Sequence, residues 1–586
     1  MKLLHLLIIS ILWRLGSACM NNCSCVPDNK GRNAVVCKEG GIVGPLSLDG
    51  MDLYTEVLVI TAPENDLNVL TMVPAFTEYR QLEEIHITRS NIPQLGEGFF
   101  FYLKNLTVLN LSQNNITQVI NKNFLGLEKL RELMLDDNRI ISIPSGTFSS
   151  LKELKVLSVQ RNRINELSHS VFQEMKKLKV LKLSGNPVRT LPVEAFRDVQ
   201  ELRTLECRGC ALSEMNKQIY PLLPHLNHLD LGENGITSLE KDEFRSLQSL
   251  KHLKLDGNKL KHLGDYVFSH LPELIKLGLA KNEIESISLT AFENADNLTE
   301  LDLGYNKIKV LKPQLFDSIR ENLLVLHLSG NPLDLEVTRD VLKNSKLRDL
   351  RLRKCKLFDV ADDVFPPTLI SLDLSENYLS GLSGKALPDG LLYLDISKNM
   401  FRGISNDDLL DKIEFINVTL LDRNPWSCDL CFIVPLMNRV NRSSSFQNIV
   451  CSHPYVVEGK KLDALDRNQL TWCSSMSYPT GDANFFSIND NSRIGILAAG
   501  MSVCLLFLIL FAIIGLICYS KRHAAKYYTH EDKLAVENDF LPDNHSPLFC
   551  DDRELSFKFP LDNSLNEKKV SIATIDEMKK EHKITN

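Results

Sequence analysis

One spacing pattern constrains this chain more than any other feature. Residues 298–308 read LTELDLGYNKI, with leucine at the first, fourth and sixth positions, asparagine at the ninth and isoleucine at the eleventh. The asparagine position recurs every 24 residues from Asn114 to Asn306, and then after 25, 24, 22 and 22 residues. Such a period indicates a solenoid, in which stacked coils bury a shared core. The position is occupied by Asn114, Asn138, Asn162, Asn186, Cys210, Asn234, Asn258, Asn282, Asn306, Asn331, Cys355, Asn377 and Asn399.

This pattern resembles the leucine-rich-repeat consensus LxxLxLxxNxL, a short strand followed by a turn. The resemblance implies an α/β solenoid of horseshoe form, with a parallel β-sheet on its concave face. We expect about 14–16 coils between residues 51 and 423. The first coils are degenerate, because residues 51–80 centre on Leu58 and Ile60 and the next copy has Ser90 at the asparagine position.

Two recurring side chains indicate how the coils are held together. An asparagine amide offers two donors and an acceptor, so it can satisfy backbone groups at the turn after each strand. A phenylalanine follows ten residues later in many coils, which predicts a buried stack beneath the convex side. These residues are Phe124, Phe148, Phe172, Phe196, Phe244, Phe268, Phe292 and Phe316.

Two cysteine clusters bracket the repeats and indicate an oxidising compartment. They resemble the N-terminal and C-terminal caps of extracellular leucine-rich-repeat proteins, such as Slit, Toll ectodomains and neuronal adhesion receptors. We assign these caps to residues 19–50 and 424–474; the second begins NPWSCDLC, one residue longer than the usual NPWxCDC. Spacing alone leaves three connectivities open for each set of four cysteines. The resemblance implies the pairs Cys19–Cys25, Cys23–Cys37, Cys428–Cys451 and Cys431–Cys473.

Three further cysteines lie within the repeats. Cys207 replaces the third leucine of its strand, and Cys210 and Cys355 stand at asparagine positions. All three side chains should therefore point inward, and we predict buried structural thiols. Because Cys207 and Cys210 form a CRGC motif, a disulfide or a redox role for Cys207 is the alternative.

The ends of the sequence predict a single-pass membrane protein. Residues 1–18 have a lysine, a short apolar run and small terminal residues, as a secretory signal peptide does. After a polar stalk at 475–493, residues 494–519 are long and apolar enough to cross a bilayer. Basic residues follow, so the tail at 520–586 should be cytoplasmic, which gives a type I plasma-membrane topology with an extracellular N-terminus. The tail could bind a cytoplasmic adaptor, and Gly495 and Ala499 could support homodimerisation.

Six N-x-S/T sequons predict glycosylation in the secretory pathway. A glycan on Asn110 would shield the N-terminal part of the concave face, because this asparagine occupies a strand position. The six acceptors are Asn105, Asn110, Asn115, Asn297, Asn417 and Asn441.

The concave face should present the residues between the strand leucines, which is where solenoid receptors usually bind ligands. Two charged patches stand out there. We predict that one or both bind a protein of opposite charge. The acidic patch contains Glu132, Asp136 and Asp137, and the basic patch contains Arg351, Arg353 and Lys354.

The sequence indicates a binding protein rather than an enzyme. It has no Gly-rich phosphate loop, HExxH or GxSxG motif, and we expect no cofactor or metal. The net charge of −7 and pI near 6.1 give no reason to expect nucleic-acid binding. We predict a cell-surface adhesion molecule or receptor subunit with an extracellular or cell-surface protein ligand. The alternatives are an innate-immune co-receptor without its own signalling domain and an organiser of extracellular or apical matrix.

Overall fold

The computed structural model describes residues 19–441 and 444–472. The described residues all belong to one compact unit of the chain. The predicted signal peptide, stalk, membrane span and tail lie outside the described residues, as does Cys473. Within 19–441 and 444–472, no helix is both long and apolar enough to cross a membrane.

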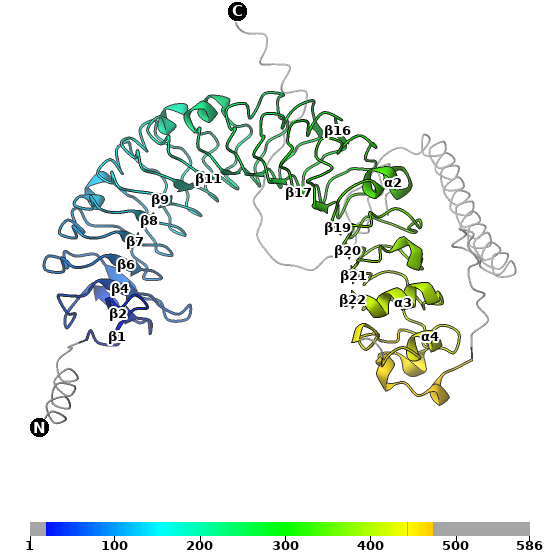
Figure 1. The fold of residues 1–586 in the computed structure, drawn as a ribbon. Coiled ribbons are helices and arrows are strands. Elements are labelled where there is room, and N and C mark those ends of the chain that lie inside the picture. Colours follow the sequence, from blue (N-terminus) through cyan, green and yellow to red (C-terminus); the bar gives the residue numbers. More distant parts are fainter. Residues whose placement is uncertain (1–18, 442–443, 473–586) are drawn as a thin grey trace, which may run out of the picture. The chain divides into compact units, whose positions relative to one another are not determined.

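The described unit is a curved solenoid whose strands line the inner side (Figure 1). Eighteen strands form one sheet. From β2 onward every neighbouring pair is parallel, and β1 pairs with β2 in the antiparallel sense. The strands are β1 Ser24–Pro27, β2 Asn33–Cys37, β4 Val57–Ile60, β6 Glu84–Ile87, β7 Val108–Asn110, β8 Glu132–Met134, β9 Val156–Ser158, β10 Val180–Lys182, β11 Thr204–Glu206, β12 His228–Asp230, β13 His252–Lys254, β15 Lys276–Gly278, β17 Glu300–Asp302, β18 Val325–His327, β19 Asp349–Arg351, β20 Ser371–Asp373, β21 Tyr393–Asp395 and β22 Val418–Leu420.

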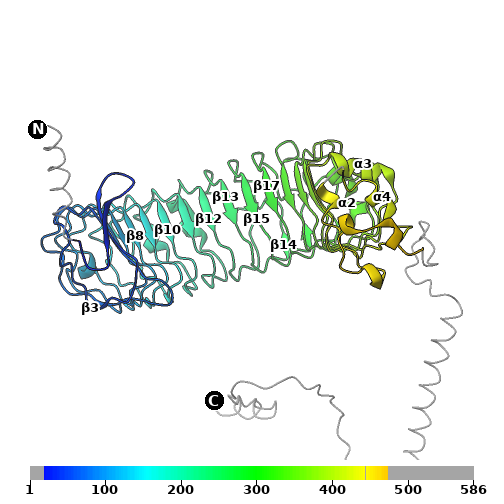
Figure 2. The ribbon, with the colours of Figure 1, turned by 90° about the horizontal axis from the view of Figure 1, so that it is seen from below.

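The register of this sheet follows the repeat. Leu181 of β10 pairs with Leu205 of β11, which pairs with Leu229 of β12, so consensus leucines meet in every layer. These leucines are completely buried, and their strand neighbours point to the opposite, concave face. Figure 2 shows the strands side by side along the inner surface. Two short parallel pairs lie apart from this sheet: β3 Val43–Pro45 with β5 Val69–Thr71, and β14 His262–Leu263 with β16 Ser286–Ile287.

The asparagine position ties each coil to the one before it. The Asn162 side-chain nitrogen donates to the carbonyls of Leu135, 2.9 Å away in the preceding coil, and Val159, 3.0 Å away in its own. Its side-chain oxygen accepts from the Ile140 amide at 3.0 Å. The same geometry recurs at other asparagine positions, including Asn258 and Asn306. The predicted role of this amide in satisfying turn backbone groups is therefore confirmed.

The phenylalanine stack forms the second connection between coils. The ring centroids of Phe244 and Phe268 lie 6.2 Å apart, those of Phe268 and Phe292 5.9 Å apart, and all three rings are buried. Tyr220 occupies the equivalent place in its coil, with its ring centroid 5.9 Å from that of Phe244. The stack was predicted, but Tyr220 as one of its members was not.

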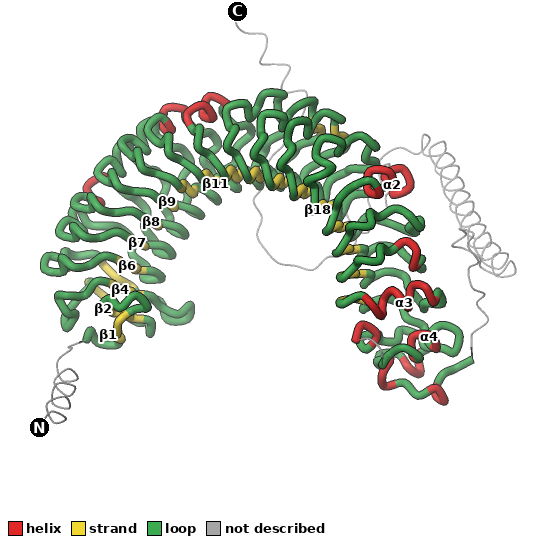
Figure 3. Tube along the Cα trace, in the orientation of Figure 1, coloured by secondary structure: helices red, strands yellow, loops and turns green. Residues whose placement is uncertain are grey.

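Short helices lie mainly on the outer side of the curve (Figure 3). The helix α2 begins after Asp334, whose carboxylate accepts hydrogen bonds from the amides of Glu336 and Val337. The α-helices are α2 Leu335–Lys343, α3 Asp407–Phe415 and α4 Val434–Met437. The 3-10 helices are η1 Asn121–Phe124, η2 Val193–Phe196, η3 Lys217–Leu222, η4 Gly384–Ala386, η5 Ser444–Phe446, η6 Tyr455–Val457, η7 Leu462–Ala464 and η8 Arg467–Gln469.

Disulfides are present at both ends of the solenoid. Near the N-terminus the bonds are Cys19–Cys25 and Cys23–Cys37, and in the C-terminal region Cys428 bonds to Cys451. These are pairs that the family resemblance implies. Cys431 is also disulfide-bonded, and its expected partner lies outside the described residues.

The prediction of free thiols at Cys207 and Cys210 is wrong, because these two residues form a disulfide. Their Cα atoms lie 5.5 Å apart, which is within the range that a disulfide bridges. The expected burial holds, since both side chains are fully buried. Cys355 is buried and free, as predicted.

Candidate ligand-binding surface on the concave face

The predicted acidic patch is largely used to join neighbouring coils. One Asp136 carboxylate oxygen accepts from the Ser158 hydroxyl and the Gln160 amide, each at 2.6 Å. Burial raises the pKa of Asp136 despite these bonds. Asp137 accepts two hydrogen bonds from Arg161, at 2.5 and 2.7 Å. Of these three residues only Glu132 is exposed, so the patch offers less free negative charge than its sequence suggests.

The predicted basic patch keeps more of its charge available. Arg353 donates to Glu376 at 2.7 Å, and Lys398 donates to the same carboxylate oxygen at 2.6 Å. The hydrogen bond from Arg353, followed by that from Lys398, lowers the pKa of Glu376 to about 2. Arg351 is half exposed, and its one ion pair with a described residue is a 3.4 Å contact with Asp349 of its own strand. Lys354 is exposed.

The coils just before the basic patch add an aromatic ring and a histidine to the same face. A Cβ atom at Gly330 would lie 2.5 Å from the Tyr305 ring, so the glycine allows this ring to lie across the next coil. The His327 ring nitrogen Nδ1 lies 3.5 Å from a carboxylate oxygen of Asp302. Burial tends to raise the pKa of Asp302, but the bonds from His327 and the Gly304 amide lower it.

Three polar atoms in this region are shielded from solvent and have no hydrogen-bond partner among the described residues. They are Nε2 of His327, Oδ1 of Asp349 and Nε of Arg353. His327 and Arg351 are register partners on β18 and β19, and Asp349 and Arg353 belong to the same coil as Arg351. Buried polar groups are nearly always paired in native proteins, so three unpaired atoms in two adjacent coils set this part of the concave face apart from its neighbours.

Sequence reasoning placed Arg351 and Arg353 here but missed His327. The signal that could have found it is its register, because His327 occupies the same strand position as Arg351 one coil earlier. The sequence shows Tyr305 as one of the variable residues between the leucines, but it does not show that the ring packs on Gly330. This glycine has a φ of 77° and no Cβ atom to meet the ring. We call this surface the concave patch, and it consists of Tyr305, His327, Asp349, Arg351, Arg353 and Lys354.

The six sequon asparagines differ in exposure. Asn297, Asn417 and Asn441 are exposed, whereas Asn105, Asn110 and Asn115 are partly buried. The Asn110 side-chain oxygen accepts from the Ser112 amide at 3.0 Å. None of these six asparagines lies in the concave patch. In residues 19–441 and 444–472, no group of three or more His, Cys, Asp or Glu side chains could hold a metal ion.

The stacked parallel coils and their asparagine ladder have the architecture of leucine-rich repeats. The family model for the leucine rich repeat matches residues 80–140, 128–188, 152–212, 224–284 and 272–333. No curated protein sequence matches the chain.

Several solved structures match parts of this chain. A leucine-rich-repeat protein of Leptospira interrogans is 25% identical with a TM-score of 0.50, and the match covers 60% of this chain and 90% of that one. Toll in its complex with Spatzle, from Drosophila, is 18% identical with a TM-score of 0.36, over 71% and 83% of the two chains. The functional domain of InlJ from Listeria monocytogenes is 19% identical with a TM-score of 0.42, over 56% and 65%.

Proposed function

We propose that this chain is a cell-surface recognition protein that binds a protein ligand through the concave patch. The observation that carries the proposal is the exposed positive charge of Arg351 and Lys354, whose one ion pair among the described residues is the 3.4 Å contact of Arg351 with Asp349. The exposed Tyr305 ring and three unpaired polar atoms, on His327, Asp349 and Arg353, lie in the same region. Tyrosine and arginine are enriched among the residues that dominate binding energy at protein interfaces.

The chemistry of the patch favours an acidic ligand surface. Arg351 and Lys354 have no strong carboxylate partner among the described residues, whereas other concave charges form ion pairs between coils, as Lys182 does with Glu206 and Lys276 with Glu300. A carboxylate of a ligand can form two parallel hydrogen bonds with an arginine, which adds geometric specificity to charge attraction.

The cellular setting is part of the same proposal. The chain is a single-pass type I protein of the plasma membrane, with the solenoid outside the cell. Support comes from the apolar segments at both ends of the sequence and from the disulfides of the solenoid, which persist in oxidising compartments. The ligand is then an extracellular protein or a protein of a neighbouring cell.

Proximity labelling on intact cells tests this function. The full-length protein is fused to an extracellular labelling enzyme and compared with a variant carrying Arg351→Glu and Lys354→Glu. Both side chains are exposed, so the reversal should leave folding intact. The matched control reverses an exposed charge on the acidic patch, Glu132→Lys.

We expect the labelled partners of the wild-type protein to be retained by the Glu132→Lys control and lost from the doubly reversed variant. Tyr305→Ala should weaken capture of the same partners, since the ring is removed without any change of charge. Identical partner sets for the wild type and the double variant would show that the concave patch is not the binding surface.

A further inference from the structure

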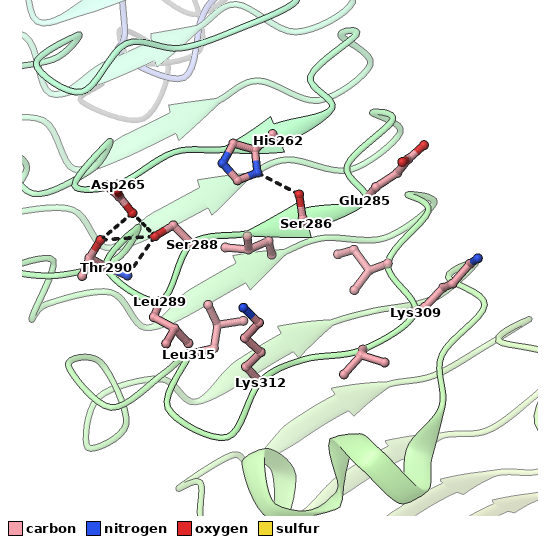
Figure 4. Close-up of a pocket in the computed structure, with 13 residues that line it drawn as sticks. His262, Asp265, Glu285, Ser286, Ser288, Leu289, Thr290, Lys309, Lys312 and Leu315 are labelled. Atoms are coloured by element: carbon pink, nitrogen blue, oxygen red, sulfur yellow. Dashed lines mark hydrogen bonds between the residues drawn. The ribbon is translucent and has the colours of Figure 1, made fainter.

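A groove lies on the flank of the solenoid, away from the concave sheet. Its volume is about 640 Å³, and it separates the coil that contains β16 from the following coil. One wall is formed by His262, Asp265 and residues 285–290, and the other by Ile308, Lys309, Val310, Lys312 and Leu315. Figure 4 shows Lys312 pointing from the second wall toward β16. We call this space the flank groove.

The flank groove lies where the backbone hydrogen bonds between β14 and β16 are not continued into the following coil. The Glu285 amide donates to Lys261 at 3.0 Å and the Ser288 amide to Leu263 at 2.9 Å, which holds β16 against β14. The residues 24 positions later are Lys309 and Lys312. In the described chain, neither amide donates a backbone hydrogen bond to the β16 coil. Lys312 is followed by Pro313, which has no backbone amide hydrogen to donate.

This interruption leaves β16 as an edge strand. The β14–β16 sheet contains these two strands alone. The Lys309 carbonyl is already occupied, because it accepts from the amide of Asp334 in the following coil at 2.8 Å. The second wall is therefore held toward α2 rather than toward β16. An exposed strand edge is a template for pairing with another extended chain.

The lining of the groove is apolar at depth and divided by charge at its rim. Ile308 and Leu315 are almost fully buried, and Leu289 and Val310 are about 40% exposed. Figure 4 shows the Asp265 carboxylate bonded to the hydroxyls of Ser288 and Thr290, so this charge is already satisfied. Lys309 and Lys312, on the opposite wall, form no ion pair within the described residues.

We propose that the flank groove binds an extended segment of a partner protein that pairs with the edge of β16. Alternate side chains of such a segment point to opposite sides. Apolar side chains on one side contact Leu289 and Val310, and an acidic side chain on the other meets Lys309 and Lys312. The proposal does not depend on the concave patch, and the two sites can bind different parts of one partner or separate proteins.

Binding of the purified full-length protein to a peptide array tests this inference. The array contains heptapeptides with valine or isoleucine at alternate positions and glutamate, glutamine, threonine or lysine at the others. A second set of the acidic members has N-methylated backbone amides, which cannot donate to a strand edge. The test variant combines Lys309→Glu with Lys312→Glu. The matched control combines Lys259→Glu with Lys261→Glu, two exposed lysines two coils earlier.

We expect acidic members to bind the wild type about tenfold more tightly than their lysine counterparts, and the test variant to lose this preference. The control variant should bind like the wild type, and N-methylation should abolish binding. The inference is overturned if no acidic member is preferred, if the preference survives in the test variant, or if N-methylated peptides bind equally well. None of these results would bear on the concave patch, because its residues are unchanged.

Discussion

Replacing Asn162 with alanine tests the physical basis of the solenoid most directly. The side chain is 7% exposed, and its nitrogen donates to carbonyls of Leu135, Val159 and Gln160 at 2.9 to 3.1 Å. Its oxygen accepts from the Ile140 amide at 3.0 Å. Alanine removes all four hydrogen bonds and leaves a methyl group in place of the side-chain amide. A methyl group can pair neither with the Ile140 amide nor with the three carbonyls.

The cost follows from how many buried groups are left without a partner. Each net hydrogen bond contributes about 0.5–1.5 kcal/mol, and a buried group left unpaired costs about 1–3 kcal/mol. Gln160 belongs to the partly buried edge of the turn, so water can replace that contact. We therefore expect Asn162→Ala to reduce the free energy of unfolding by about 3–5 kcal/mol, a large share of the roughly 5–15 kcal/mol typical of a folded domain.

Two measurements check this value. Denaturant unfolding gives the change in stability, and hydrogen exchange reports whether the Ile140 amide loses protection before distant coils do, as nearest-neighbour coupling in a solenoid predicts. The control is Asn65→Ala, because Asn65 is exposed, and its effect should stay within about 0.5 kcal/mol. If Asn162→Ala matches the control, or if Ile140 keeps its protection, then the asparagine ladder does not hold the coils together.

Three further predictions follow from individual side chains. Because the pKa of Glu376 falls from 4.5 to about 2, the stability that its ionised carboxylate contributes is complete above about pH 4.5 and is lost as the pH falls to about 2. Glu376→Gln should therefore lower the unfolding temperature at pH 7 but not at pH 2. An equal difference at the two pH values would contradict this prediction. Burial raises the pKa of Cys355 to about 12, so its thiol should not react with iodoacetamide at pH 8 in the native protein. Peptide mapping should find residue 355 unmodified before unfolding and modified after it. Rapid modification of the native protein would disprove the burial of this thiol. Gly330→Ala should displace the Tyr305 ring and weaken ligand binding at the concave patch, whereas Gly381→Ala, with open space around it, should leave binding unchanged.

The regular parts of this fold could be predicted from sequence because one periodic signal determines them. The leucines, the asparagine ladder and the phenylalanine stack repeat with the coil, so one coil predicts the next. Cys207 and Cys210 illustrate the limit. Their positions predicted burial correctly, but a pattern of inward-pointing residues does not indicate the 5.5 Å Cα separation that allows the disulfide.

The candidate sites were less predictable because they depend on contacts between coils rather than on the repeat itself. Asp136 and Asp137 looked like free charges in the sequence, yet Ser158 and Arg161 of the next coil engage them. Conversely, the Lys309 and Lys312 ammonium groups gave no signal, since charge is ordinary on a solvated flank. Lys309 and Lys312 become candidate binding residues only because the edge strand β16 lies across the groove from them.

Both proposed sites lie next to a change in repeat length. Between Asn114 and Asn306 each coil has 24 residues, so a backbone group in one coil lies in register with its counterpart in the next. The step from Asn306 to Asn331 is one residue longer, and it is in this coil that the flank ladder is interrupted. The unpaired atoms of His327, Asp349 and Arg353 lie in this coil and the one that follows. A coil of different length changes the register with its neighbour, so the hydrogen bonds that join the coils of equal length are not all repeated there.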